Sequence, residues 1–382
     1  MSAARGLLLA APKSGSGKTV LTLGLLRHWT RSGIAAVPFK AGPDYIDAAY
    51  HSAAAGQACI NLDSWAMRGR SLDASAAALA QGAEFVLGEG VMGLFDGAAG
   101  GGGATADLAA HFSLPVVLVI DVRGQGASVA ALAQGFASHR ADVEVAAVIF
   151  NHVASARHEE ILNSALAPTG IAVLGALPRD AALALPTRHL GLVQAGESED
   201  LEAFLNAAAN HVARYVNGEG LRALGRPLRA PHGATPPCLL EPLGQKIAVA
   251  RDMAFAFSYE AVLAGWRQAG AALSFFSPLA DEAPETGADA IYLPGGYPEN
   301  HAGQLAANRN FIGGLRCAAN NDVCIYGECG GYMVLGDGLI DAAGQRHAMA
   351  GLLPLETSFA VPRLHLGYRE AEMLRDAPFA AT

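Results

Sequence analysis

The sequence has little charge, and the charge it has is mostly negative. Only 16% of its 382 residues are Asp, Glu, Lys or Arg, and the formal net charge is −9. This balance gives no support for nucleic acid as the main partner. Apolar residues make up 52% of the chain, which is typical of a globular protein with buried parallel sheets and argues against disorder.

Cysteines and long apolar runs are also scarce. The five cysteines are scattered and none forms a Cys-x-x-Cys pair, so neither a zinc site nor a disulfide framework is predicted. No segment is long and apolar enough to span a bilayer, and the run Leu7–Ala11 is too short for a signal sequence. We therefore expect a cytoplasmic protein with no membrane partner.

The length of the chain exceeds one ordinary core, so we expect two domains. Over residues 1–216, short apolar runs alternate with amphipathic stretches, which predicts an α/β domain with a doubly wound parallel sheet. The predicted strands are Gly6–Ala11, Ile34–Phe39, Phe85–Glu89, Leu114–Asp121, Val145–Asn151 and Ile171–Leu177. The predicted helices are Thr19–Ser32, Leu72–Gln81, Ala127–Ser138 and His158–Ala165.

A second α/β domain is predicted after a break in composition. Residues 217–245 are dense in glycine and proline, which is typical of a linker. A new alternation of strands and helices follows over residues 246–382. Its predicted strands are Lys246–Arg251, Leu273–Phe276, Ala290–Leu293 and Val323–Tyr326, and its predicted helices are Tyr259–Ala269 and Gly303–Asn320.

The run from Ser14 to Thr19 resembles a phosphate-binding loop between the first predicted strand and helix. Backbone N–H groups of such a loop can surround phosphate oxygens, Lys18 can reach the β- and γ-phosphates, and the Thr19 hydroxyl can bind Mg²⁺. Pro12 stands where the usual pattern has glycine, and an ordinary glycine-rich turn is the alternative. The strand before and the helix after favour an ATP site, whose residues would be Ser14, Gly15, Gly17, Lys18 and Thr19.

Four charged residues follow two of the predicted strands. Because loops at the carboxyl ends of strands line the ligand crevice of a doubly wound sheet, these residues are expected to meet the phosphate loop. A single carboxylate is more often a solvated residue or a helix cap, but four charges at two strand ends favour function. We expect Asp44 and Glu89 to bind Mg²⁺ with Thr19, and Lys40 and Asp96 to act in phosphoryl transfer.

A cysteine among small residues near the C-terminus predicts a nucleophile. Cys329 follows the apolar run Val323–Tyr326 and is flanked by glycines, as on a tight turn that exposes a reactive side chain. Backbone N–H groups of Gly295, Gly296 and Gly330 could form an oxyanion hole. Cys324, inside the strand, is predicted to be a core thiol. A nucleotide site and a thiol nucleophile imply two half-reactions.

Several longer runs complete a pattern over nearly the whole chain. They are Ala11–Thr19, Phe39–Asp47, Asn61–Trp65, Glu89–Gly97, Pro178-Arg179, Pro186–Leu192, Ala248–Asp252 and Tyr292–Glu299. With these runs, the chain resembles the cobyrinate (or hydrogenobyrinate) a,c-diamide synthase family. The resemblance implies a dethiobiotin-synthetase-like ATP domain and a class I glutamine amidotransferase domain with a flavodoxin-like fold.

The resemblance also implies an activity in cobalamin biosynthesis. ATP and Mg²⁺ would convert the a- and c-carboxylates of a corrinoid or related tetrapyrrole into acyl phosphates, and glutamine would supply nitrogen through Cys329. The family's partner histidine follows a segment like Leu366–Glu370, so we expect it beyond Thr382, with the glutaminase half incomplete. We do not expect His347 or His365 to replace it.

Alternatives stay open at this point. Amidation of a nickel sirohydrochlorin would use the same residues, and a P-loop ATPase with a non-catalytic amidotransferase-like domain is a rival from another class. Cobalt-containing and metal-free rings are both open as substrates, and so is a homodimer. Arg188 and His189 would either contact the substrate carboxylates or have a structural role.

Overall fold

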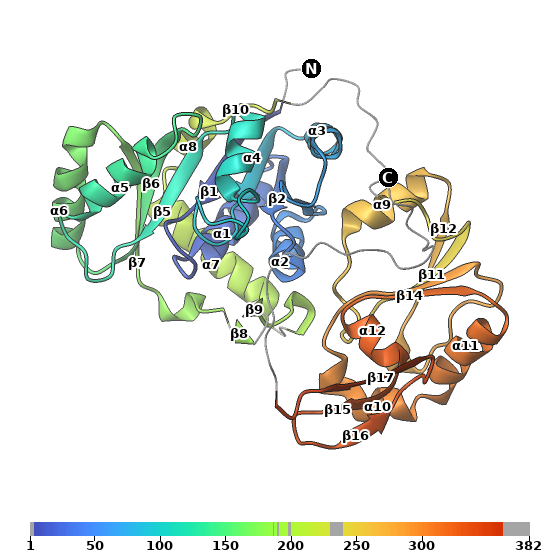
Figure 1. The fold of residues 1–382 in the computed structure, drawn as a ribbon. Helices are drawn as coiled ribbons and strands as arrows, with labels where there is room; N and C mark the ends of the chain where they lie inside the picture. Colours follow the sequence, from blue (N-terminus) through green and yellow to red (C-terminus); the bar gives the residue numbers. More distant parts are fainter. Residues whose placement is uncertain (1–3, 186, 189–190, 198–199, 230–239, 362–382) are drawn as a thin grey trace. The chain divides into compact units, whose positions relative to one another are not determined.

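The computed structural model describes residues 4–185, 187–188, 191–197, 200–229 and 240–361 (Figure 1). The chain divides into two compact units, Met1–Pro237 and Cys238–Thr382. Each unit contains its own parallel sheet. Among the described residues, no helix has the length and apolar character needed to cross a membrane.

The first unit is built on a parallel sheet in the strand order β3-β2-β4-β1-β5-β6-β7. Its strands are β1 (Arg5–Ala10), β2 (Ala36–Ala41), β3 (Ile60–Leu62), β4 (Phe85–Glu89), β5 (Val116–Asp121), β6 (Val145–Val153) and β7 (Ala172–Pro178). The central strands β1, β4 and β5 are mostly apolar because helices cover both faces, and charged residues stand only at their ends. The predicted doubly wound α/β fold is confirmed.

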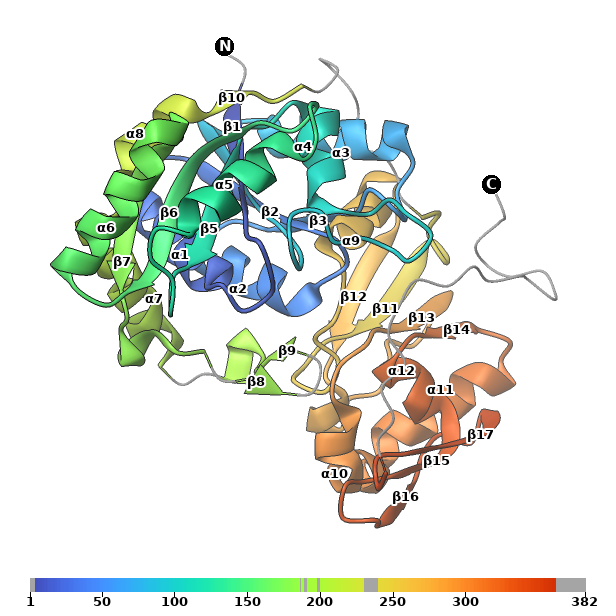
Figure 2. The same ribbon diagram turned by 60° about the vertical axis from the view of Figure 1, so that its left-hand side comes forward.

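The helices of the first unit form two layers (Figure 2). On one face α1 (Lys18–Arg31), α2 (Tyr45–Ala55) and α7 (Leu201–Tyr215) pack together. The other face carries α3 (Gly69–Ala80), α4 (Thr105–Phe112), α5 (Val129–Ser138) and α6 (Ala156–Leu166). Shorter pieces are η1 (Ala167–Thr169), η2 (Ala181–Leu183), β8 (Thr187–Arg188), β9 (Gly191–Leu192) and η3 (Ala195–Glu197).

The start of the predicted linker forms secondary structure of the first unit. Helix α8 (Gly218–Leu224) begins where the Asn217 side chain accepts a hydrogen bond from the Gly220 N–H (2.8 Å). Strand β10 (Arg226–Pro227) then pairs antiparallel with β1, and the Arg5 guanidinium donates to the Gly225 carbonyl (2.8 Å). The glycines and proline that indicated a linker therefore serve a short helix and an edge strand here.

The second unit has a smaller parallel sheet in the order β12-β11-β13-β14. The strands are β11 (Lys246–Ala250), β12 (Ala272–Phe276), β13 (Ala290–Leu293) and β14 (Cys324–Gly327). Helix α9 (Glu260–Gln268) packs on one face, around Trp266 and Tyr292. The opposite face meets α10 (Ala302–Ala307), α11 (Arg309–Asn320) and α12 (Gly330–Leu335).

Two further features of the second unit differ from a plain alternation of strands and helices. The predicted helix Gly303–Asn320 is two helices, α10 and α11, because the chain breaks at Asn308, whose amide donates to the Pro278 carbonyl (2.7 Å). After α12, strands β15 (Gly336–Ile340), β16 (Arg346–Ala348) and β17 (Leu353–Ser358) form a separate sheet. The second unit also contains the short pieces η4 (Pro278–Ala280) and η5 (Pro298–His301).

Candidate functional sites

The phosphate loop joins β1 to α1 and is braced from a neighbouring strand. Gly17 has φ = 89°, and a Cβ there would lie 2.1 Å from the Asn151 amide nitrogen, so only glycine fits. The Asn151 amide donates to the Ser16 carbonyl (2.9 Å). Position 12 needs no glycine, because φ at Pro12 is not positive. The departure from the usual pattern is therefore compatible with the loop geometry.

The open part of this loop is formed by Ser14 and Gly15. Both are exposed, and a Cβ added at Gly15 would meet no heavy atom within 4 Å beyond its neighbours in the chain. Lys18, in contrast, is buried, and its ammonium donates to the Met92 carbonyl (2.8 Å). Burial lowers the pKa of Lys18, although the nearby charge of Glu89 opposes the shift. The loop thus has exposed backbone and one buried cation.

A buried ionic cluster lies beside the loop. The Lys40 ammonium contacts Glu89 Oε1 (2.8 Å) and Asp47 Oδ2 (2.5 Å), and all three residues are buried. The Thr19 hydroxyl donates to the same Glu89 oxygen (2.8 Å) and lies 3.5 Å from Asp47 Oδ2. The carboxyl ends of β2 and β4 and the first turns of α1 and α2 thereby meet.

The charges in this cluster depend on one another. Burial alone would lower the pKa of Lys40, but Glu89 and Asp47 outweigh it and raise this pKa above its ordinary value. Burial would raise the pKa of Glu89, but Lys40 and a hydrogen bond from His51 hold it well below its usual range. Asp47 has a raised pKa because of its burial, while the attraction of Lys40 opposes that shift. Lys40 and Glu89 are therefore charged at neutral pH.

The structure adds Asp47 and His51 to the residues expected from the sequence. Both lie on α2, four residues apart, so they share one face of the helix. His51 Nε2 is 2.7 Å from Glu89 Oε2, and His51 Nδ1 is 3.8 Å from the Cys59 sulfur. The i, i+4 spacing after the Asp44 cap is the sequence signal that would have indicated them.

Two predicted site residues have local structural contacts instead. Asp44 caps α2, since its Oδ1 accepts hydrogen bonds from the N–H groups of Ile46 (2.9 Å) and Asp47 (3.1 Å). Asp96 is exposed, and its Oδ2 accepts from the Gly93 N–H (2.9 Å). Their expected roles in metal binding and catalysis stay predictions.

The oxygen atoms beside Lys40 fit a magnesium ion. No group of three or more His, Cys, Asp or Glu side chains in the described part of the chain is arranged to hold a metal ion alone. Mg²⁺ is usually held by one or two carboxylates together with substrate phosphates. Thr19, Asp47 and Glu89 supply hard oxygen atoms of this kind next to the phosphate loop.

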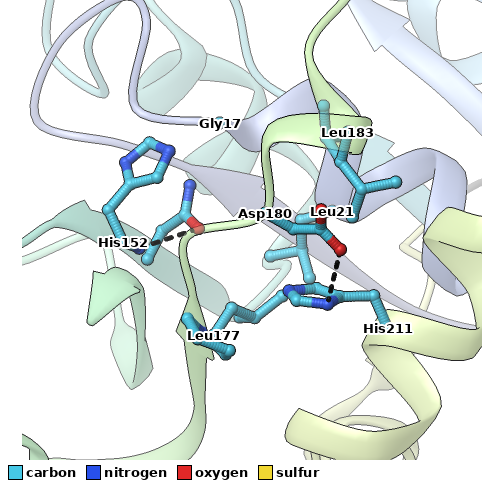
Figure 3. A pocket seen from close by; sticks show the side chains of 10 residues that line it. Gly17, Leu21, His152, Leu177, Asp180, Leu183 and His211 are labelled. Atoms are coloured by element: carbon cyan, nitrogen blue, oxygen red, sulfur yellow. Dashed lines mark hydrogen bonds and ion pairs between the residues drawn. The ribbon is translucent and has the colours of Figure 1, made fainter. Parts of the chain in front are cut away.

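A pocket opens beside the phosphate loop, at the carboxyl ends of β6 and β7 (Figure 3). Its apolar wall includes Leu21, Leu177 and Leu183. Polar groups stand at its edge, where His211 Nδ1 lies 3.8 Å from an Asp180 carboxylate oxygen. An apolar wall with a polar edge can hold a flat heteroaromatic ring and read its hydrogen-bonding groups. The remaining lining residues are Gly17, Val20, Asn151, His152 and Pro178.

The second unit presents Cys329 on a strained turn between β14 and α12. Its φ of 48° and ψ of −113° are unusual for any residue with a side chain. The residue is exposed, yet partial burial of the thiol raises its pKa above the ordinary value, and Glu299 and Glu328 add to this. The turn has the conformation expected of a nucleophile elbow.

The predicted oxyanion glycines surround this thiol. Hydrogen bonds from the N–H groups of Gly296 and Gly330 to Cys329 act against the raised pKa, because they favour the thiolate. A Cβ on Gly296 would lie 2.0 Å from the Ala254 carbonyl, so glycine is required there. Gly295 also lies close, since a Cβ on it would be 3.3 Å from the Cys329 sulfur. Two N–H donors therefore converge at the sulfur.

The structure also shows where some of the remaining candidate residues from the sequence lie. Cys324 is on β14, and partial burial raises the pKa of its thiol. His347 is on β16, and its Nε2 lies 2.8 Å from Asp341 Oδ2. His189 and His365 lie outside the described residues, as does the side chain of Arg188.

The two sites together define an ATP-dependent ligase with a glutamine amidotransferase domain. Residues 7–193 match the model of the CobQ/CobB/MinD/ParA nucleotide binding domain, and residues 246–377 match the CobB/CobQ-like glutamine amidotransferase domain. The hydrogenobyrinate a,c-diamide synthase of Brucella anthropi is 56% identical over 377 residues, 98% of this chain and 86% of the relative. That of Rhodobacter capsulatus is 53% identical over 378 residues, with the same coverage. The chain belongs to the hydrogenobyrinate a,c-diamide synthase family.

The family resemblance read from the sequence is thereby confirmed, as is the class of enzyme. Among solved structures, chloroplast FtsY from Physcomitrella patens is 16% identical, with a TM-score of 0.36, over 55% of this chain and 66% of that chain. That likeness is too slight to bear on function.

Proposed function

We propose that this protein amidates the a- and c-carboxylates of hydrogenobyrinate in cobalamin biosynthesis, with ATP as the activating substrate and glutamine as the nitrogen donor. The proposal is supported by the similarity of the chain to the hydrogenobyrinate a,c-diamide synthases of Brucella anthropi and Rhodobacter capsulatus. The observation that carries it is the presence, in one chain, of a phosphate loop with a buried Lys40–Glu89 pair and of a strained Cys329 with two N–H donors. Each half of such a reaction needs one of these sites.

The first unit would activate the carboxylate. A free carboxylate is a poor electrophile, whereas an acyl phosphate carries a good leaving group. In this step a carboxylate oxygen bonds to the γ-phosphorus and the bond to ADP breaks. Lys18 and Lys40 would stabilise the charge on the transferring group, and the base of ATP would occupy the pocket beside Gly17.

We also propose that Thr19, Asp47 and Glu89 hold Mg²⁺ at this site. The ion, when bound, would neutralise charge on the β- and γ-phosphates. Asp47 and Glu89 both contact the Lys40 ammonium, so the two carboxylates are already held together by a cation before any ligand binds.

The second unit would supply ammonia. The Cys329 thiolate would attack the glutamine carboxamide, and the N–H groups of Gly296 and Gly330 would stabilise the oxyanion. Collapse releases ammonia and leaves a thioester, which water hydrolyses to glutamate. Ammonia then attacks the acyl phosphate, so that a C–N bond forms and phosphate leaves.

The test is an assay with ATP, Mg²⁺, hydrogenobyrinate and either glutamine or ammonium chloride. We expect mono- and diamide products by mass spectrometry, with one ADP formed for each amide. Parallel assays with cobyrinate and nickel sirohydrochlorin would identify the ring substrate. Absence of ring-dependent ADP formation with every ring and both donors would contradict the proposal.

The cytoplasmic location and the homodimer considered from the sequence stay predictions. Gel filtration with light scattering would test the homodimer. The order of the two amidations can be read from the time course of the monoamides.

A further inference from the structure

His51 is fully buried (0% exposed) and is used by no step of the chemistry described above. Its Nε2 lies 2.7 Å from Glu89 Oε2, and Glu89 is also buried. A histidine in the interior of a helix–sheet interface can be a packing residue. Here its ring nitrogen instead contacts the carboxylate that also binds Thr19 and Lys40.

The direction of the hydrogen bond between His51 and Glu89 follows from the carboxylate. Glu89 forms an ion pair with Lys40, and the oxygens of a carboxylate only accept hydrogen bonds. His51 Nε2 therefore carries a proton and donates it to Glu89 Oε2. The other ring nitrogen, Nδ1, lies 3.8 Å from Cys59 Sγ.

The two oxygens of Glu89 thus have separate partners. Oε2 is held by His51, and Oε1 accepts from Lys40 and Thr19. With both oxygens bonded from different sides, the carboxylate cannot rotate, and Oε1 stays on the side of the phosphate loop. Partners behind a metal-binding carboxylate commonly affect metal affinity by roughly 10- to 100-fold.

We infer that His51 is a positioning residue of the Mg²⁺–nucleotide site: it holds Glu89 so that Oε1 faces Thr19 and the phosphate loop. This inference rests on the proposed Mg²⁺ site. It assigns a role to both residues of the Asp47-x-x-x-His51 pair on α2. Asp47 would offer a carboxylate oxygen to the ion, and His51 would orient the carboxylate of Glu89.

Two substitutions separate positioning from packing. In His51→Gln, the amide nitrogen can reach the place of Nε2 and donate to Glu89. In His51→Asn, the amide is polar but too short to reach it. Both variants remove the ring, so a packing role predicts similar effects, whereas a positioning role predicts a difference between them.

The measurement is binding of Mn²⁺, as a spectroscopic substitute for Mg²⁺, to the full chain with ADP, followed by electron paramagnetic resonance. We expect His51→Asn to weaken Mn²⁺ binding by about 10- to 100-fold and His51→Gln to restore most of the affinity. The Mg²⁺ concentration for half-maximal amidation should shift in parallel. Binding of ADP without a divalent ion should not change.

Four outcomes would overturn the inference. Equal Mn²⁺ affinities of the two variants in a folded protein would assign His51 to packing, as would a change in melting temperature without a change in affinity. Weaker ADP binding without metal would mean that the phosphate loop itself is disturbed. If the unsubstituted protein bound no Mn²⁺ with ADP, the proposed Mg²⁺ site would fail, and the role of His51 with it.

Discussion

Lys40 and Glu89 are register partners on the adjacent strands β2 and β4, and their side chains form a buried ion pair with a Nζ–Oε1 distance of 2.8 Å. The pair lies where both strands end, next to Thr19 of the phosphate loop. Removing one member leaves the other charge buried without its partner, which is costly for the fold. Isosteric substitutions are therefore the informative ones at this site.

Loss of charge at the phosphate site should abolish amidation with both nitrogen donors. We expect Lys18→Ala and Glu89→Gln to lower the rate on the order of 10²–10³-fold, because both act on phosphoryl transfer rather than on ammonia release. ADP and amide formation with glutamine and with ammonium chloride are the measurements. Glu84→Gln, at an exposed carboxylate just before β4, is the control and should change little. Near-normal ammonia-dependent amidation by folded Glu89→Gln would contradict the assignment.

Substitution of the two thiols around β14 should separate the nucleophile from a packing residue. Cys329→Ala is expected to lose whatever glutamine-dependent amidation the chain has, and to keep ammonia-dependent amidation. Cys324→Ala should keep both at a modest packing cost, since its thiol is only partly buried. The assay compares the two donors in each variant. If Cys324→Ala lost glutamine-dependent amidation and Cys329→Ala kept it, Cys324 would be the nucleophile.

The reactivity of Cys329 toward alkylating reagents should increase with pH and keep increasing above the ordinary cysteine pKa, because the pKa of Cys329 is raised. Since burial favours the neutral thiol, the reactive thiolate is scarce at pH 7 and becomes more abundant as pH rises past the ordinary value of about 8.5. The rate of alkylation by iodoacetamide, followed by peptide mass spectrometry, should keep rising above that pH. The exposed Cys317 is the internal comparison. A plateau below pH 8 would mean that the N–H groups of Gly296 and Gly330 outweigh the burial.

Two glycines of the phosphate loop should respond differently to an added methyl group. Gly15 and Gly17 both have positive φ, 74° and 89°, so alanine introduces backbone strain at each. Only at Gly17 would the new Cβ also collide with Asn151, at 2.1 Å, whereas the surroundings of Gly15 are open. We expect Gly17→Ala to lower the melting temperature of the nucleotide-free protein more than Gly15→Ala. Equal shifts would show that the contact with Asn151 is easily relieved.

Much of the fold follows from local sequence because buried strands are compact apolar runs. The predicted bounds of Phe85–Glu89 and Ala290–Leu293 match β4 and β13. Helix α2 was not predicted, since its small alanines mark no clear apolar face. The break at Asn308 was also missed, because it depends on a hydrogen bond to the distant Pro278.

The phosphate loop and the thiol turn could be predicted because each is contiguous in sequence. The sequence also predicted that Lys40 and Glu89 meet the phosphate loop, but it did not predict that Asp47 and His51 join them, since this depends on β4 inserting between β1 and β2 in the sheet. That insertion brings β4 beside Lys40 and the face of α2 that carries Asp47 and His51. The sequence alone placed a metal-binding role on Asp44, which stays a prediction, and it did not single out Asp47, the residue of α2 that lies 3.5 Å from the Thr19 hydroxyl.

The backbone of Cys329 has a further consequence for how this domain can evolve. A φ of 48° with ψ of −113° is accessible to glycine at little cost, so the proposed nucleophile occupies a position where glycine would have less backbone strain. Cys329→Gly should therefore give a protein at least as stable as its parent but with no thiol. The proposed role in glutamine hydrolysis, and not the backbone conformation, gives cysteine an advantage here. A descendant that only bound ligands could arise by one substitution that is energetically downhill.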